Sequence, residues 1–278
     1  MNHDISQARS VVRSGHFEEG LPILEKAHAS GNVTASASVA EVFGFLGRWD
    51  EVYQFCSAVL GKPSTIETQN VVTEATMLLI AGCWNTDNWS VASRSVAQAL
   101  KVARSTAAHP EHLSDLERLL VYTKSQGAAK YPVPEDGFAD ESLTDRMHAF
   151  EKAVKSLPKK KPKLFKDHVA RRNHIFALAT VYGYHAGAVR VFEQMGPPDS
   201  FDDTVFLAKG LVLSGREADA WNVIITGVPL WWPVDPVQVA PVELLIDPSL
   251  YTIMSTDRCI DVLRTPRGPE RVVSSTGP

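Results

Sequence analysis

One spacing of small and apolar residues recurs four times along the chain, with glycine at a fixed place in each copy. The copies begin at Ala8, Ala40, Phe176 and Ala208, so the first two are 32 residues apart, as are the last two. A constant period between about 20 and 50 residues is typical of stacked repeat arrays. Each unit of such an array buries its apolar face against its neighbours. This pattern constrains the fold more strongly than composition does.

Each copy predicts a hairpin of two helices. Its small and apolar residues are three to five positions apart, which places them on one helical face. Its first glycine falls where the first helix ends and the chain turns. A weaker copy, with helices predicted over 68–83 and 89–104, has Asp87 at the place of this glycine. The well-matched copies have these members: Ala8, Val11, Gly15, Gly20, Leu24 and Ala27; Ala40, Phe43, Gly47, Val52, Cys56 and Val59; Phe176, Ala179, Gly183, Ala188, Phe192 and Met195; Ala208, Leu211, Gly215, Ala220, Ile224 and Gly227.

Two segments interrupt the helical pattern. Residues 126–144 are rich in proline, glycine and acidic side chains, and five prolines fall between residues 229 and 250. Proline lacks a backbone N–H group and breaks a helix interior. We therefore divide the chain into four parts: N-terminal helical repeats (1–125); an interruption with an acidic, proline-bearing loop, a short helix and a basic loop (126–165); C-terminal helical repeats (166–229); and a proline-rich cap and tail (230–278).

The composition is that of a folded protein without a strong charge bias. Hydrophobic residues make up 44% of the chain and charged residues 22%, and the formal net charge is -4. This balance gives no general attraction to nucleic acid or anionic lipid. The start of the chain lacks a signal-peptide pattern, and no apolar run reaches the length of about 18 residues that a membrane span needs. We expect a soluble, cytoplasmic protein without a membrane partner.

Sequence motifs give no support for catalysis, a metal site or a cofactor. Cys56, Cys83 and Cys259 lack the spacing of a zinc site or a disulfide framework. His109 and His112 are close in sequence, but no third or fourth ligand is near them. No phosphate-binding glycine loop, nucleophile elbow or metalloprotease motif occurs. We expect no enzymatic activity, no catalytic residue, no metal and no cofactor.

The repeated spacing, and the phrase GHFEEGLPILEKA at residues 15–27 in particular, resembles tetratricopeptide repeats. The resemblance implies an all-α, right-handed solenoid of helical hairpins. It also implies that a concave groove, lined by the first helix of each hairpin, binds a peptide or a protein surface. The resemblance thus favours a non-catalytic scaffold or adaptor that binds a protein or peptide segment. In this register the side chains that face the groove are Arg9, Arg13, Glu41, Arg172, Asn173 and Lys209.

Two other hypotheses remain open. A nucleic-acid-associated regulator would use the basic 159–172 stretch, because lysines there can contact phosphates. An immunity-like or antitoxin-like protein would instead cover the active site of a partner enzyme. Trp231 and Trp232 either close the open end of the array or anchor a partner. The candidate polyanion-binding residues are Lys159, Lys160, Lys161, Lys163, Lys166 and Arg171.

Overall fold

The fold is all-α, as the sequence predicts. The computed structural model describes residues 2–60, 69–105, 110–128, 142–157 and 168–268, and all regular structure within these ranges is helical. The chain divides into two compact units, which we describe separately. The first unit combines Met1–Val133 with Trp232–Pro278, and the second consists of Pro134–Trp231.

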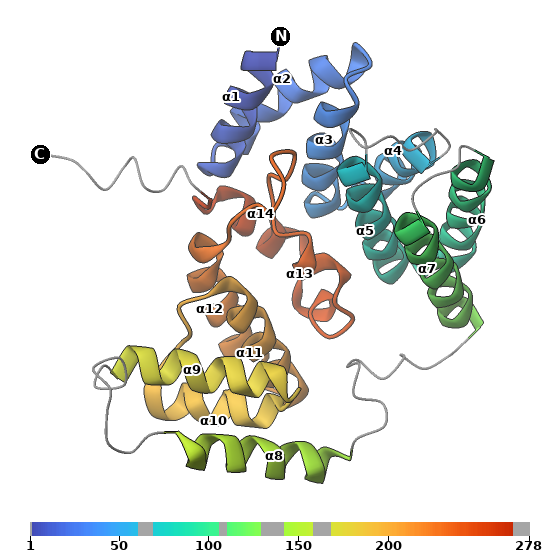
Figure 1. Cartoon of the computed structure of the whole chain (residues 1–278). Helices are drawn as coiled ribbons and strands as arrows, with labels where there is room; N and C mark the ends of the chain where they lie inside the picture. The colour runs from blue at the N-terminus through green and yellow to red at the C-terminus, as the bar shows by residue number, and fades with distance from the viewer. Residues whose placement is uncertain (1, 61–68, 106–109, 129–141, 158–167, 269–278) are drawn as a thin grey trace, which may run out of the picture. The chain divides into compact units, whose positions relative to one another are not determined.

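The first unit is built from N-terminal helices that pack in sequential pairs, together with helices from the end of the chain (Figure 1). The helix predicted over 68–83 begins at Gln69 and extends to Thr86, and the one predicted over 89–104 extends to Ser105. The helices are α1 (Asn2–Arg13), α2 (Phe17–Ala29), α3 (Val33–Phe45), α4 (Trp49–Leu60), α5 (Gln69–Thr86), α6 (Trp89–Ser105), α7 (Pro110–Ala128), α13 (Glu243–Ile246), the 3-10 helix η3 (Tyr251–Ile253) and α14 (Thr256–Arg264).

The second unit contains helices α8 to α12 and a short 3-10 helix. Ser142 and Ser200 cap the N-termini of α8 and α11, where each hydroxyl accepts a hydrogen bond from a backbone N–H group. Phe176, Leu207 and Leu211 are fully buried in the core of this unit. The helices are α8 (Leu143–Ser156), α9 (His168–Val181), α10 (His185–Met195), α11 (Phe201–Leu213), α12 (Glu217–Gly227) and η2 (Val228–Leu230).

The turns inside the hairpins repeat the same backbone geometry. The predicted turn glycines Gly15, Gly47, Gly183 and Gly215 all have positive φ angles, between 58° and 94°. Asp87, which takes the place of glycine in the weaker copy, is the one other residue type with positive φ among the described residues, at 56°. Aspartate tolerates this left-handed region better than most side chains do.

Equivalent hydrogen bonds close these turns. The N–H group that follows each glycine donates to the carbonyl group five residues earlier, as at the end of a helix with a left-handed residue. The bonds run from His16 to Val11 (3.1 Å), Arg48 to Phe43 (2.9 Å), Tyr184 to Ala179 (2.8 Å) and Arg216 to Leu211 (2.8 Å). Four copies of one turn, at the places where the spacing predicts them, support the hairpin interpretation of each copy.

The C-terminal part of the chain, Trp232–Pro278, belongs to the first unit, and it covers nearly all of the stretch that the sequence assigns to a proline-rich cap and tail, 230–278. Within this unit α14 packs against α3 and α13 packs against α5. Leu244, Leu245 and Leu250 are fully buried there. The physical reason lies in α3, because every residue from Ala35 to Phe45 is buried and such a helix needs cover on all sides.

The two adjacent tryptophans differ in their environments. Trp231, at the end of the second unit, is 3% exposed, and Trp232, at the start of the C-terminal part of the first unit, is 60% exposed. One of the pair is therefore buried, in agreement with the high cost of leaving two large apolar side chains in water. Whether either residue anchors a partner stays a prediction.

The turn glycines provide a matched test of the packing of the C-terminal part. Gly15 and Gly215 share positive φ, but a Cβ atom at Gly15 would overlap the Arg264 carbonyl group, whereas nothing lies within 4 Å at Gly215. Both Gly15→Ala and Gly215→Ala place a side chain on a left-handed backbone, which lowers the free energy of unfolding by about 1–2 kcal/mol. Gly15→Ala should lower the free energy of unfolding by about 1–3 kcal/mol more, because it overpacks the contact.

Urea unfolding of the two purified variants, followed by circular dichroism, measures this difference. Equal losses in the two variants would show that the turn between α1 and α2 does not pack tightly on the end of α14.

Candidate functional site

The first helices of the N-terminal hairpins carry polar side chains on one face, and residues 235–240 lie against it. Arg9 on α1 and Glu41 on α3 occupy equivalent positions, 32 residues apart. The 235–240 segment is not helical, and it begins with a turn in which the Gln238 N–H group donates to the Asp235 carbonyl group. We call the surface formed by α1, α3 and α5 the first groove.

Glu41 binds the backbone of this segment directly. Its Oε2 atom accepts hydrogen bonds from the N–H groups of Val239 (2.6 Å) and Ala240 (2.8 Å). Glu41, Val239 and Ala240 are all buried, so water does not replace these bonds. A carboxylate that accepts two backbone N–H groups makes strong, charge-assisted hydrogen bonds. Glu41 therefore recognises the path of the backbone rather than the identity of the side chains.

The carbonyl groups of the segment also have partners on α1 and α3. The Ser38 hydroxyl donates to the Val237 carbonyl oxygen at 2.6 Å and accepts a bond from Arg9 Nε at 2.8 Å. Arg13 Nη1 donates to the Gln238 carbonyl oxygen at 3.2 Å. The first groove thus pairs both the donors and the acceptors of a non-helical backbone, as burial of such a segment requires.

Arg267 fixes the other side of the segment. Its side chain is 0% exposed, and its Nε atom donates to the Val239 carbonyl oxygen at 2.9 Å. Its Nη1 atom donates to the carbonyl oxygens at the end of α14, those of Val262, Leu263 and Thr265, each at 3.0 Å. A buried arginine in this place both caps α14 and ties it to the segment.

Two buried glutamates meet under the segment. Burial, followed by the nearby charge of Glu74, raises the pKa of Glu41 well above its ordinary value. Burial also raises the pKa of Glu74 to about 7. The Oε2 atom of Glu74 accepts a hydrogen bond from Gln238 Nε2 at 3.1 Å. Burial lowers the pKa of Arg9, while its attraction to Glu41 acts in the opposite direction.

Sequence reasoning missed several members of this site. Arg9, Arg13 and Glu41 were expected to face a groove, and the structure places all three against the chain's own segment. Glu74 gave a signal, because it is the one charged residue in the helix predicted over 68–83. The repeat register gives no signal for three other members of the site, which are Ser38, Gln238 and Arg267.

The other expected groove residues lie in the second unit. Arg172 and Asn173 on α9 both contact Asp199, at 2.6 Å from Arg172 Nη2 and 3.1 Å from Asn173 Nδ2. Arg172 Nε also donates to Asn173 Oδ1 at 3.1 Å. Lys209 lies half-buried on α11. These side chains therefore belong to a different unit from Arg9, Arg13 and Glu41.

The basic stretch is placed only in part. Arg171 is half-buried on α9. Its five lysines lie outside the described residues: Lys159, Lys160, Lys161, Lys163 and Lys166. A nucleic-acid-binding role for this stretch stays a prediction, as does the inhibitor hypothesis.

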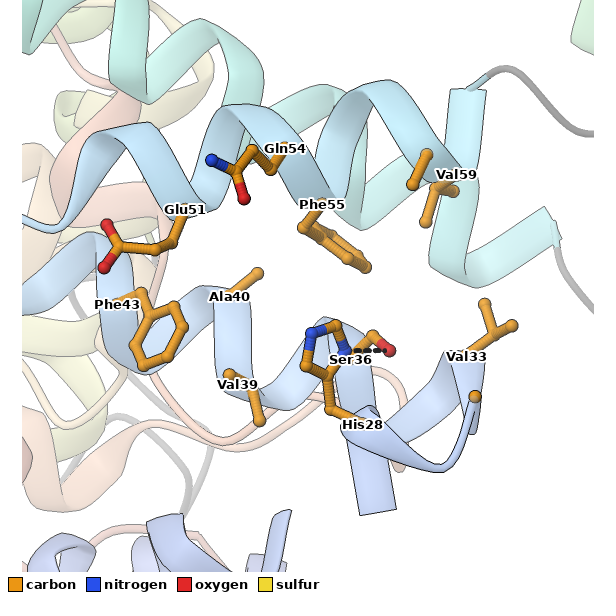
Figure 2. A pocket seen from close by; sticks show the side chains of 12 residues that line it. His28, Val33, Ser36, Val39, Ala40, Phe43, Glu51, Gln54, Phe55 and Val59 are labelled. Carbon is orange, nitrogen blue, oxygen red and sulfur yellow. Dashed lines mark hydrogen bonds between the residues drawn. The ribbon is translucent and has the colours of Figure 1, made fainter. Parts of the chain in front are cut away.

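A pocket of about 370 Å³ opens between α2, α3 and α4, on the first unit (Figure 2). Its walls are mainly apolar and include Phe43 and Phe55, while Glu51 and Gln54 supply polar atoms. His28 Nδ1 lies 2.7 Å from the Ser36 hydroxyl. That hydroxyl also lies 2.8 Å from the Asn32 carbonyl oxygen, to which it donates a hydrogen bond.

The cysteines are buried and unreactive in their environment. Burial raises the pKa of both Cys83 and Cys259 to about 12 and that of Cys56 above its ordinary value. The thiolate is the reactive form of cysteine. These three side chains therefore act as small apolar groups in the core, as we predicted for Cys56.

No family model, curated protein or solved structure matches the chain. In the part of the chain that the structure describes, no helix combines the length and the apolar character needed to cross a membrane. Function is therefore inferred from the chemistry of the chain's own residues.

The two bonds to Glu41 Oε2 predict how strongly the segment is held. Glu41→Ala should leave the N–H groups of Val239 and Ala240 buried without partners, at a cost of about 1–3 kcal/mol each. Glu41→Gln keeps an acceptor oxygen and should cost less. Denaturant unfolding at constant pH measures both changes, and hydrogen exchange reports the two amides directly. Equal stability of the two variants would contradict this account of the segment.

Proposed function

We propose that the protein is a non-catalytic interaction module, a scaffold or adaptor, that binds a non-helical segment of a partner protein along the first helices of its hairpins. We further propose that these hairpins form a right-handed solenoid similar to tetratricopeptide repeats. The repeated turns and the sequential packing of the helices support this arrangement.

One observation carries the proposal. In the first groove, α1 and α3 already hold a non-helical segment of the chain itself, and they do so through backbone groups. Backbone recognition does not depend on one particular side-chain sequence, so the same type of surface suits segments from other proteins. A hydrogen-bonded segment with apolar contacts is a common mode of peptide recognition.

Among the described residues of the second unit, the equivalent surface carries exposed apolar side chains. Arg13, Phe45, Val181 and Leu213 occupy the same position in the four copies of the hairpin. Phe45 is 0% exposed in the first unit, whereas Val181 on α9 is 63% exposed and Leu213 on α11 is 58% exposed. We call the surface formed by α9 and α11 the second groove, and we propose that a partner segment binds there.

The polar residues of the second groove fit the same mode of binding. Lys209 corresponds in register to Arg9 and Glu41, which hold the segment in the first groove. Asn173 adds an amide group on the same side of α9, one helical turn before Ala177. Full burial of one valine or leucine side chain contributes about 1.5–3 kcal/mol, so Val181 and Leu213 would supply much of the binding free energy.

Charges placed at the exposed apolar positions test this proposal. The double variant Val181→Asp/Leu213→Asp should lose at least tenfold in affinity for the partner, because binding would bury two unpaired carboxylates. Its free energy of unfolding should change by less than about 0.5 kcal/mol, because both side chains face solvent. Val121→Asp on α7 of the first unit is the matched control, since Val121 is 68% exposed.

The measurement has two steps. Affinity purification with the wild-type chain first identifies the partner, and calorimetric titration then compares the three purified proteins. Unchanged affinity of the double variant, or loss of affinity in Val121→Asp as well, would overturn the second groove as the binding site.

A further inference from the structure

Two buried carboxyl oxygens in the first groove lack a hydrogen-bond donor. They are Oε1 of Glu41 and Oε1 of Glu74, and the two residues are 0% and 2% exposed. The Oε2 atoms of both residues already accept bonds, from the backbone of the 235–240 segment and from Gln238. Both residues bind the same stretch of the segment, residues 238–240, and the helices that carry them, α3 and α5, pack against each other.

A hydrogen bond between two carboxyl groups needs a proton. Ionised carboxylates are acceptors only, so a hydrogen bond between the two Oε1 atoms requires that one of the groups carries a proton and acts as the donor. We propose that Glu41 and Glu74 share a single proton between α3 and α5, and that this proton holds the 235–240 segment in the first groove. Glu74 supports the segment through Gln238, and Glu41 supports it through Val239 and Ala240.

Charged groups of the neighbouring elements lie in the same site. α1 contributes Arg9 and Arg13, the segment contributes Asp235, and α13 contributes Glu243. The negative charges of Asp235 and Glu243 raise the pKa of Glu74, in addition to the larger effect of burial. Arg9 attracts Glu41; its Nε atom donates to Ser38, and its Nη2 atom is buried without a hydrogen-bond partner in the described structure. With Glu41 and Glu74 included, the site holds four acids against Arg9, Arg13 and the buried Arg267 that binds Val239, which favours retention of one proton.

Loss of the proton would place two negative charges side by side in a buried site. Like charges on neighbouring side chains repel each other strongly where water is excluded. Movement of Glu74 toward solvent relieves this repulsion, and it also breaks the bond to Gln238. The segment then keeps its bonds to Glu41 but loses its support on α5. The first groove is thus most firmly closed when the pair is protonated.

The direction of the pH effect follows from the folded and unfolded states. An unfolded glutamate releases its proton near its ordinary pKa of 4.5, whereas folding raises the pKa of Glu74 to about 7. The stabilising contribution is therefore complete below about pH 4.5 and is lost as the pH rises through 7. Across this window the folding equilibrium constant should fall by up to about tenfold per pH unit from this group.

Infrared spectroscopy of the full chain tests for the proton itself. At pH 6 the wild-type protein should show the carbonyl stretching band of a protonated carboxylic acid, and this band should disappear as the pH rises past 7. Glu74→Gln should lack the band, because its amide group donates to Glu41 in place of the proton. Glu217→Gln is the control, since Glu217 is exposed on α12 of the second unit and its replacement should leave the band unchanged.

Unfolding and hydrogen exchange test the link to the segment. In the wild-type protein, stability and the protection of the Val239 and Ala240 amides should decline between pH 6 and pH 8. Both should be nearly constant in Glu74→Gln once intrinsic exchange rates are subtracted. Glu41→Gln also supplies an amide donor, so its stability and amide protection should likewise be nearly constant across this pH range. Agreement of the two variants would show that the effect does not come from a local change at position 74 alone.

Other occupants of the gap between the two oxygens give different results. A bridging water between two ionised groups would show no band of a protonated acid at pH 6. A bound cation would make the wild-type stability depend on added salt and not on pH in this window. Either result, or identical pH profiles for wild type and both variants, would overturn the proposal.

Discussion

The burial of α3 is the constraint on which the first unit depends. Its residues are apolar or small on nearly every side, and the neighbouring helices α2, α4 and α5 cover only part of its surface. The rest of the cover comes from α14 and the 235–240 segment. Glu41 and Val239 are separated by 198 positions in the chain. The N-terminal repeats and the end of the chain are therefore parts of one cooperative structure.

This arrangement explains why the first helices carry charged residues within an apolar surface. A non-helical segment brings N–H and carbonyl groups into the interface, and each costs free energy if it is buried without a partner. Glu41, Ser38 and Arg13 supply those partners from α1 and α3. The polar residues of the first groove are thus needed for the fold, and they show at the same time how such a surface recognises a backbone.

Local features of the fold could be predicted from the sequence, and long-range ones could not. The turn glycines and Asp87 can be identified from the sequence, because a left-handed backbone conformation restricts which side chains a position tolerates. The direction of Arg9, Arg13 and Glu41 follows from the helical register. The occupant of the first groove depends on a contact between distant parts of the chain, which leaves no periodic signal. Glu74 and Arg267 acquire their roles only through that contact.

The two grooves differ in what the fold requires of them. In the first unit the cover over α3 completes the core, so it is a structural part of the protein. In the second unit Phe176, Leu207 and Leu211 are already fully buried, while Val181 and Leu213 stay exposed. The described residues of the second unit thus fill its core while these two positions on α9 and α11 stay exposed. We propose that a partner segment covers this surface, because the fold does not need it covered and because it shares its register with the surface that holds the 235–240 segment.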